Sequence, residues 1–209
     1  MLRLYSTPGA IVFDFGGVLV DWNPRHLYRK LFHGDDAAME NFLTEVGFNE
    51  WNLQQDLGRD FATAVGELAA RFPHHERLIR AYDERWEESI AGPIQASVDL
   101  LAPLKRAGHE LHGLSNWSSE KFAVARAKYR FFDLFETILI SGDVRLAKPD
   151  PRIFEILLQR IGKSAKECLF IDDSGKNVVA ARAQGFDTIH FKLPARLRQE
   201  LQSRKLLGA

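Results

Sequence analysis

Short apolar runs alternate with segments of helical periodicity through most of the chain. Residues 10–15 are apolar apart from Asp14 and run into Gly16-Gly17, which is typical of a buried strand that ends in a turn. Four similar runs predict further strands, at residues 110–115, 137–141, 168–172 and 188–191. Helical patterns lie between and after them, at residues 94–107, 119–129, 150–161, 177–184 and 194–207. This alternation predicts an α/β fold in which helices cover both faces of a parallel sheet.

Residues 21–92 interrupt the alternation, because their apolar positions follow helical spacing and we find no strand-like run among them. Four apolar stripes predict four helices, namely Leu27, Tyr28, Leu31 and Phe32; Met39, Phe42, Leu43 and Val46; Phe61, Val65, Leu68 and Phe72; and Ile79, Tyr82, Trp86 and Ile90. The Gly92-Pro93 pair is typical of a return to the sheet. We therefore expect a discontinuous Rossmann-like core, residues 1–20 and 93–209, with an inserted all-helical cap domain at residues 21–92.

Composition excludes several classes of protein. Of the 209 residues, 45% are hydrophobic and 27% are charged, as in ordinary globular proteins. Lys+Arg and Asp+Glu number 28 each, so no net charge attracts a phosphate backbone, and we expect no nucleic-acid partner. A single cysteine, Cys168, excludes a disulfide within the chain. The apolar run at residues 10–20 is too short to cross a membrane and lacks a cleavage site, so we expect a cytoplasmic protein. We expect it to be a monomer or a weak homodimer.

Polar side chains stand where the predicted strands end. Asp14 ends the first strand, Ser115-Asn116 the second and Asp172-Asp173 the fourth, and Lys148 follows the third after a short loop. Because the carboxyl ends of parallel strands meet at one edge of a sheet, we expect these groups to share one cleft. Three carboxylates repel one another, and Lys148 balances only one of them. A divalent cation would neutralise the rest, and an all-oxygen ligand set favours Mg²⁺, whose shell a phosphate can complete.

Four motifs, in this order, resemble the haloacid dehalogenase-like (HAD) superfamily, and within it the sugar-phosphate phosphatases with a helical cap, such as the α-D-glucose-1-phosphate phosphatase-like proteins. The motifs are Phe13-Asp14-Phe15-Gly16-Gly17-Val18-Leu19, Leu114-Ser115-Asn116, Lys148-Pro149-Asp150-Pro151, and Ile171-Asp172-Asp173-Ser174 with Asn177. Each follows a predicted strand, and together they extend over nearly the whole chain. The resemblance implies a hydrolase that transfers a phosphoryl group in two steps, through an aspartyl phosphate.

The resemblance also implies a role for each motif residue. Asp14 is implied to be the nucleophile. Mg²⁺ is implied to bind Asp14, Asp173 and the main-chain carbonyl of Gly16, with Asp172 acting directly or through water. The implied ligands of the phosphate oxygens are Ser115, Lys148, Asn116 and backbone N–H groups.

Gly16 departs from the family pattern, which has a second aspartate two residues after the nucleophile. That aspartate protonates the leaving group and activates water, and such acid–base help is worth about 10²–10⁴-fold in rate. We expect one of three compensations. The leaving group is intrinsically good, such as the anomeric oxygen of a sugar; another residue after the nucleophile, for example Asp21 or His26, donates the proton; or turnover is slow.

Aromatic and basic side chains near the motifs are candidates for the mouth between core and lobe. Aromatic faces stack on sugar rings and arginines hold anions, so we expect substrate contacts from Trp22, Arg25 and Trp117. Core packing is the expected role of Trp51 and Trp86. The adjacent pair His74-His75 lacks the spacing of a metal-binding pair.

We thus predict a Mg²⁺-dependent phosphomonoesterase that acts on a small phosphometabolite, with a sugar phosphate as the preferred class. One alternative is a 2-haloacid dehalogenase that uses Asp14 as its nucleophile. A metal-free dehalogenase has no use for Asp172 beside Asp173, and their charge would repel a carboxylate substrate. The other alternative is a non-catalytic sensor of a phosphate ligand, which lost turnover together with its acid.

Overall fold

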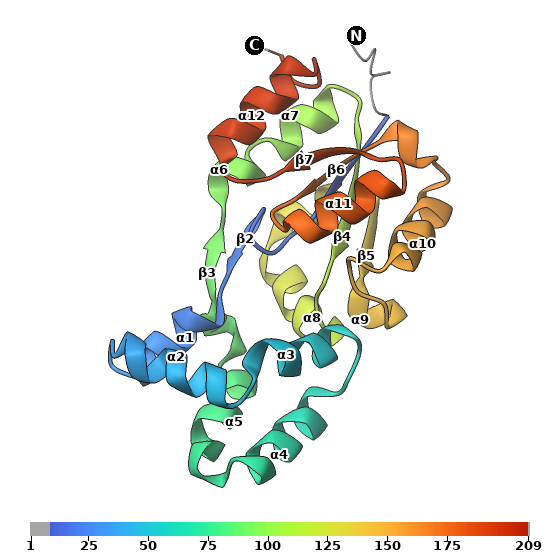
Figure 1. Ribbon diagram of the computed structural model, residues 1–209. Coiled ribbons are helices and arrows are strands. Elements are labelled where there is room, and N and C mark those ends of the chain that lie inside the picture. Colours follow the sequence, from blue (N-terminus) through green and yellow to red (C-terminus); the bar gives the residue numbers. More distant parts are fainter. Residues whose placement is uncertain (1–8, 209) are drawn as a thin grey trace.

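The computed structural model describes residues 9–208, and its centre is a five-stranded sheet. The strands are β1 (Ala10–Phe13), β4 (Glu110–Ser115), β5 (Thr137–Ile140), β6 (Cys168–Asp172) and β7 (Asp187–His190). Their order across the sheet is β5-β4-β1-β6-β7, and every neighbouring pair is parallel (Figure 1). The predicted α/β fold is confirmed, and β1, which carries the first motif, lies at the centre of the sheet.

Helices cover both faces of this sheet, because alternate residues of a strand point to opposite faces. Ile11 and Phe13 of β1 pack in the apolar cluster that includes residues of α7 (Leu101–Arg106), α8 (Ser119–Lys128) and α12 (Pro194–Ser203). Ala10 and Val12 pack in a second cluster, with α10 (Pro151–Ile161) and α11 (Gly175–Ala183). The structure also contains two short helices, α6 (Gln95–Val98) and α9 (Ser141–Val144), and four 3₁₀ turns, at Pro73–His75, Trp86–Ser89, Arg130–Leu134 and Ala165–Glu167.

The continuous helix expected at residues 94–107 is instead divided into α6 and α7. Pro103 lies in the first turn of α7 and has no N–H to donate to the carbonyl of Asp99. A helix running through both segments would lose that bond, so the chain turns and a new helix begins at Leu101.

Five helices form a separate group at one end of the molecule, which we call the helical lobe (residues 24–89). They are α1 (Pro24–Leu31), α2 (Asp36–Glu45), α3 (Phe48–Asp56), α4 (Phe61–Arg71) and α5 (Glu76–Glu84). The sequence predicted four helices and missed α3, because the buried face of α3 includes Asn52 and Gln55 and its apolar periodicity is weak. The fourth stripe was partly wrong: α5 ends at Glu84, and Trp86 lies in the following 3₁₀ turn.

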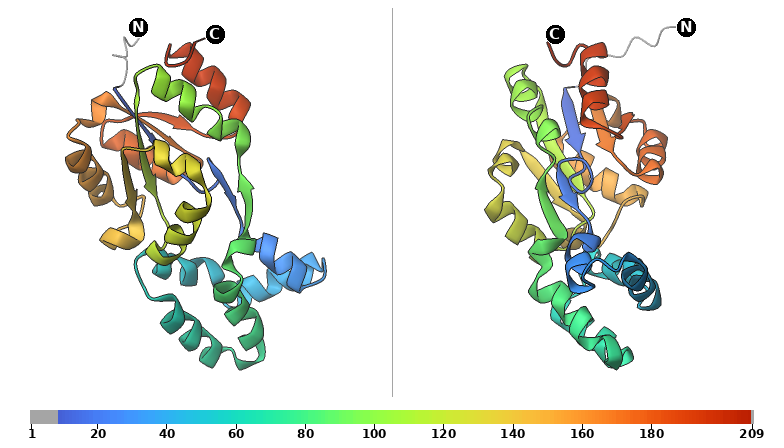
Figure 2. Two further views of the ribbon diagram at one scale, coloured as in Figure 1. Left: turned by 180° about the vertical axis from the view of Figure 1, so that it is seen from behind. Right: turned by 90° about the vertical axis from the view of Figure 1, so that its left-hand side faces the viewer.

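Two short antiparallel strands connect the helical lobe to the core. They are β2 (Val20–Trp22) and β3 (Ile90–Pro93), which carry the chain out to the lobe and back (Figure 2). The expectation that residues 21–92 hold no strand was therefore wrong. At three and four residues, the strands are too short for an alternating pattern to be visible in the sequence. Within residues 9–208 there is no helix with the length and apolarity that crossing a membrane requires.

A close contact between Phe15 and β4 fixes the chain just after the first strand. The ring of Phe15 lies against Gly113 of β4, where an added Cβ would be 2.1 Å from the ring. The same ring packs against Phe122, Phe132 and Phe135. Since Phe15 follows Asp14 directly, this packing holds the end of β1 in place.

We predict that Gly113→Ala lowers the free energy of unfolding by about 1–3 kcal/mol, because the new methyl group must displace a buried ring. Urea unfolding measures the change. Gly66→Ala, in the middle of α4, is the matched control: its methyl group would meet nothing within 4 Å, so it should stabilise by up to about 1 kcal/mol. Equal stability of Gly113→Ala and the unsubstituted protein would contradict the packing described here.

Candidate active site

The carboxyl ends of β1 and β6 bring three carboxylates together. Asp14 follows the last residue of β1, Asp172 ends β6, and Asp173 comes next. The in-register pairing of Phe13 with Ile171 places the ends of these neighbouring strands at one level. One carboxylate oxygen from each aspartate lies within 4.8 Å of the others, an arrangement that can hold a metal ion.

Lys148 is buried at the centre of this group. Its Nζ lies 2.9 Å from Asp14 Oδ1 and 2.7 Å from Asp172 Oδ2, and it donates to the carbonyl of Leu114 at 2.8 Å. The side-chain amide of Asn116 makes two hydrogen bonds to the main chain of Lys148. Its Nδ2 donates to the Lys148 carbonyl at 2.9 Å, and its Oδ1 accepts from the Lys148 N–H at 2.8 Å. Asn116 therefore positions Lys148.

Hydrogen-bond donors fix the two buried carboxylates. Asp14 Oδ1 accepts from the N–H of Phe15 at 2.7 Å and from Ser115 Oγ at 2.8 Å, in addition to its contact with Lys148. Asp172 accepts from Asn177 Nδ2, 3.1 Å from each oxygen, and from the N–H of Ser174 at 2.8 Å. Asp172 thus has several partners among the described residues, and Asn177 is one of its positioning groups.

Asp173 differs from the other two aspartates because it is exposed. Its carboxylate rests against the main chain at Gly17, where an added Cβ would lie 2.3 Å from Asp173 Oδ2. Gly17 has a φ of +71° as well, so both the space and the backbone conformation require glycine there. By contrast, a Cβ added to Gly16 would meet nothing within 4 Å.

The charges in this site do not balance. Burial raises the pKa of Asp14 to about 7; Lys148 opposes this rise, while Asp172 and Asp173 add to it. Although Asp173 is exposed as a whole residue, partial burial of its carboxylate and the neighbouring Asp172 raise its pKa as well. Burial disfavours the ammonium of Lys148, but Asp14 and Asp172 outweigh that effect and raise its pKa. The site therefore holds more carboxylate charge than one lysine neutralises, and its oxygen ligands suit a hard divalent cation such as Mg²⁺.

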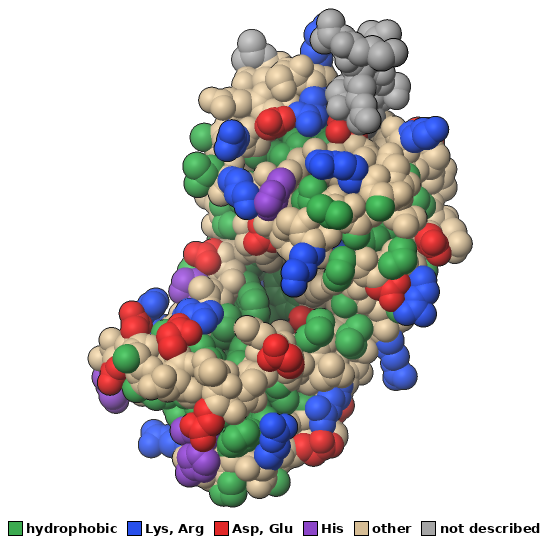
Figure 3. Space-filling view, in the orientation of Figure 1, with side chains coloured by type: hydrophobic (Ala, Val, Ile, Leu, Met, Phe, Trp, Pro, Cys, Tyr) green, Lys and Arg blue, Asp and Glu red, His purple; other side chains and the backbone are tan. Residues whose placement is uncertain are grey.

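A pocket of about 50 Å³ opens beside Gly16, between the core and the helical lobe, and Figure 3 shows a hollow between these two parts. Its lining combines five aromatic rings with polar groups, and consists of Gly16, Trp22, Asn52, Asp56, Phe61, Tyr82, Trp86, Asn116, Trp117 and Ser118. The candidate residues Trp22 and Trp117 are among them, although Trp117 is mostly buried between Trp86 and Phe122. Trp86, expected to be a core residue, also lines the pocket.

Three other residues singled out from the sequence do not line this pocket. Arg25 binds Glu40 with two hydrogen bonds, of 2.5 and 2.7 Å, and borders a different hollow on the lobe. His26 Nε2 and Asp21 Oδ1 lie 3.0 Å apart at the surface, so these two residues pair with one another.

Two residues of the pocket lining, Asn52 and Asp56, are not singled out by any pattern in the sequence. They belong to no motif, and they reach the pocket through the packing of α3 against the core. Ser141 Oγ, at the start of α9, donates to the main-chain carbonyl of Asp56 at 2.5 Å. The polar buried face of α3 was the available signal.

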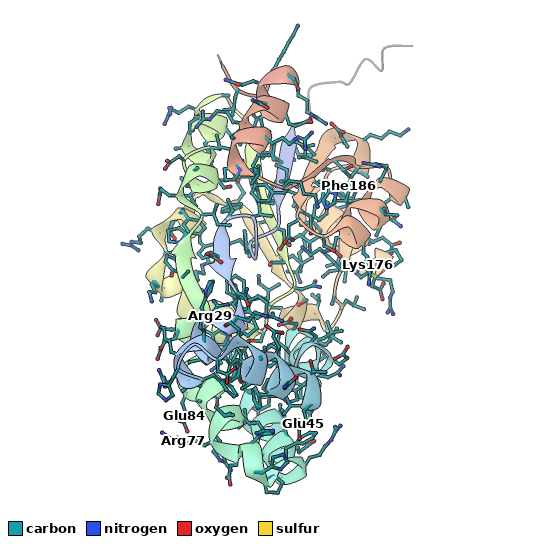
Figure 4. All side chains as sticks on the ribbon, turned by 60° about the vertical axis from the view of Figure 1, so that its left-hand side comes forward. Arg29, Glu45, Arg77, Glu84, Lys176 and Phe186 are labelled. Atoms are coloured by element: carbon teal, nitrogen blue, oxygen red, sulfur yellow. The ribbon has the colours of Figure 1, made fainter. Side chains whose placement is uncertain are left out.

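A second group of metal-binding residue types lies on the helical lobe. Despite the unfavourable spacing of His74 and His75, both imidazoles reach Glu45, with Nε2–Oε distances of 2.9 and 3.0 Å. Figure 4 labels Glu45 on the lobe, away from the sheet. Each oxygen of Glu45 is hydrogen-bonded to one of the two rings.

Comparisons with known proteins identify a family of hydrolases. The family model of haloacid dehalogenase-like hydrolases matches residues 8–185. The sesquiterpene phosphatase astK of Aspergillus oryzae is 29% identical over 208 residues, 97% of this chain and 98% of that protein. The (S)-2-haloacid dehalogenase 4A of Burkholderia cepacia is 30% identical over 139 residues, 66% of this chain and 57% of that protein.

A solved structure with a similar fold is that of a HAD family enzyme of Bacteroides thetaiotaomicron in complex with magnesium and inorganic phosphate. Its TM-score is 0.68 and its sequence identity is 26%, and the match covers 88% of this chain and 94% of the other.

We predict that Mg²⁺ raises the melting temperature of the protein and that Asp173→Asn abolishes this rise. At a hundredfold excess over Kd, a ligand stabilises the folded state by about 2.7 kcal/mol. Without Mg²⁺, Asp173→Asn should melt at or above the temperature of the unsubstituted protein, because it removes a negative charge that partial burial and Asp172 disfavour. Differential scanning fluorimetry with and without EDTA measures both effects. Glu45→Gln is the control and should keep the full shift; loss of the shift in that variant would place the metal on the lobe instead.

Proposed function

Because the chain belongs to the haloacid dehalogenase-like hydrolase family, we propose that it is a Mg²⁺-dependent phosphomonoesterase of a small phosphometabolite. The observation that carries this proposal is the group of Asp14, Asp172 and Asp173 gathered around Lys148. The charge excess of that group suits a cation and a phosphoryl group together, a combination that also occurs in the related magnesium and phosphate complex.

Asp14 is the nucleophile in this mechanism. The N–H of Phe15, Ser115 Oγ and Lys148 Nζ contact its Oδ1 at 2.7, 2.8 and 2.9 Å. With Oδ1 held by three donors, we assign the attack on phosphorus to Oδ2. The new bond to phosphorus forms as the bond to the leaving group breaks, and water then hydrolyses the aspartyl phosphate. Ser115 and Lys148 also stabilise the charge that develops on the phosphoryl oxygens.

Asp14, Asp173 and the main-chain carbonyl of Gly16 are the residues that would hold Mg²⁺. When bound, the cation supplies positive charge that draws the phosphoryl oxygens to Asp14 and favours the ionised form of its carboxyl. Asp172 already binds Lys148 and Asn177, which favours a water-mediated role for it at the metal.

The pocket beside Gly16 is the proposed site of the leaving group. Its rings suit the C–H faces of a sugar, and its polar groups suit sugar hydroxyls, so a sugar phosphate is the preferred substrate class. We assign substrate contacts to Trp22 and Trp117. Arg25 would have to leave Glu40 to reach the pocket, and it receives no contact in this assignment. Residues 21–92 would act as a cap domain that excludes water from the cleft.

Carbon–halogen hydrolysis is the second candidate function, because a dehalogenase is among the relatives and Asp14 could serve as its nucleophile. The carboxylates of Asp172 and Asp173 argue against it, since they would repel a haloacid. Halide release from 2-chloropropionate in EDTA would support this candidate over the phosphatase.

We predict that the protein hydrolyses p-nitrophenyl phosphate with Mg²⁺ and that Asp14→Asn lowers kcat by about 10⁴-fold or more, because the amide cannot attack phosphorus. Phosphate release in the presence of Mg²⁺ or EDTA is the assay. Asp36→Asn, an exposed carboxylate in α2, is the control and should keep full activity. Tight phosphate binding without turnover in the unsubstituted protein would instead identify a sensor.

A panel of phosphate esters tests the substrate class. We predict the highest kcat/KM for hexose and pentose phosphates, because the pocket combines stacking surfaces with hydrogen-bonding groups. Higher kcat/KM for a terpenyl monophosphate would refute the sugar assignment while leaving the phosphatase proposal intact.

A further inference from the structure

We propose that Asp56 of the helical lobe is the acid that protonates the leaving group, in place of the carboxyl that is missing at Gly16. This inference rests on the proposed phosphatase function and adds the identity of its proton donor. Asp56 is the last residue of α3, and it is the one carboxylic acid among the ten described residues that line the pocket.

The pocket connects Asp56 to the reacting groups. Gly16, two residues after the nucleophile, lines the core side of the pocket together with Asn116, the residue that holds Lys148. A Cβ added at Gly16 would meet nothing within 4 Å, so the space that a second aspartate would use is open. A leaving group in this pocket therefore has Gly16 on its core side and Asp56 on its lobe side.

Two contacts fix Asp56 against the core, although its helix belongs to the lobe. Ser141 Oγ donates to the main-chain carbonyl of Asp56 at 2.5 Å. Two residues further on, Gly58 has a φ of +90°, and an added Cβ there would lie 2.8 Å from the carbonyl oxygen of Gly142. Figure 1 shows α3 as the lobe helix beside α8 and α9. The carboxyl is thus held in a defined place relative to the catalytic strands.

The surroundings of Asp56 suit an acid that is protonated near neutral pH. Asn52 Nδ2 donates to Asp56 Oδ2 at 3.2 Å, and Tyr82 donates to Asn52 Oδ1 at 3.0 Å. No described pocket-lining residue is cationic. Burial raises the pKa of Asp56 to about 7, against the effect of the N–H of Ser118. An acid with a pKa near the working pH combines a protonated population with a strong tendency to donate.

Four titratable groups on the elements around Asp56 have other partners. Tyr82 of α5 donates to Asn52, and Lys121 of α8 pairs with Asp83. Glu120 of α8 accepts from the N–H of Phe61, and Asp143 of α9 accepts from Ser119. The side chain of Arg145, which follows α9, lies against the position of Gly58. The two donors considered from the sequence, Asp21 and His26, pair with one another outside the pocket lining.

Asp56 alone can supply and take back the proton that is transferred during the reaction. As Asp14 forms its bond to phosphorus, the Asp56 carboxyl gives its proton to the ester oxygen of the departing alcohol. The products of this step are the alcohol, the aspartyl phosphate and the Asp56 carboxylate. That carboxylate then takes a proton from the water that attacks phosphorus, which releases hydrogen phosphate and restores both Asp14 as a carboxylate and Asp56 as an acid.

Leaving-group dependence tests this role directly. We expect Asp56→Asn to lower kcat/KM by about 10²–10⁴-fold for alkyl phosphates, whose leaving groups need a proton. For p-nitrophenyl phosphate, whose leaving group needs none, the loss should be small. The fall in kcat/KM above about pH 7 on alkyl phosphates should disappear with the acid. Asp60→Asn is the matched control, because it makes the same change four residues away at the N-cap of α4, where asparagine also caps.

A rescue variant strengthens the test. Gly16→Asp should restore alkyl phosphate turnover to Asp56→Asn, because it places a carboxyl in the open space beside the same leaving group. An equal loss on all leaving groups would show that Asp56 is structural, and an equal gain from Gly16→Asp in both backgrounds would show that no acid was present before. Either result would overturn the inference. Absence of any phosphatase activity in the unsubstituted protein would refute the proposed function instead.

Discussion

The ion pairs of one buried lysine organise the whole site. Lys148 contacts Asp14 after β1, the carbonyl of Leu114 in β4 and Asp172 at the end of β6, so its ammonium joins three adjacent strands. A buried charge is tolerated only when such partners replace its hydration. The same contacts leave an excess of carboxylate charge around it. That excess is the physical reason to expect both a divalent cation and a phosphoryl group at this edge of the sheet.

The sequence predicted the sheet and the lysine-centred group because both depend on local patterns. Strands buried on both faces read as nearly continuous apolar runs, and the polar residues that end them stand out against that background. In a parallel sheet the carboxyl ends of the strands then lie at one edge, irrespective of the conformation of the loops. The sequence pattern alone therefore groups Asp14, Ser115, Lys148 and Asp172.

The features that were missed depend on packing between distant segments. Asp56 belongs to no motif, and it reaches the pocket because Ser141 and the close approach at Gly58 hold the end of α3 on the core. Helix α3 itself was missed, since a helix that buries Asn52 and Gln55 lacks an apolar stripe. In the proposed mechanism the core supplies the nucleophile and most of the charge, while the lobe supplies the apolar pocket and the proton. This division accounts for a glycine at position 16.

The most direct measurement of the central proposal is mass spectrometry of the protein quenched in acid during turnover of a phosphate ester with Mg²⁺. The account predicts that the peptide containing Asp14 gains the mass of one phosphoryl group, that the modification maps to Asp14, and that EDTA prevents it. Steady turnover with no modified Asp14 under any quench time, or a phosphoryl group on another residue, would contradict it.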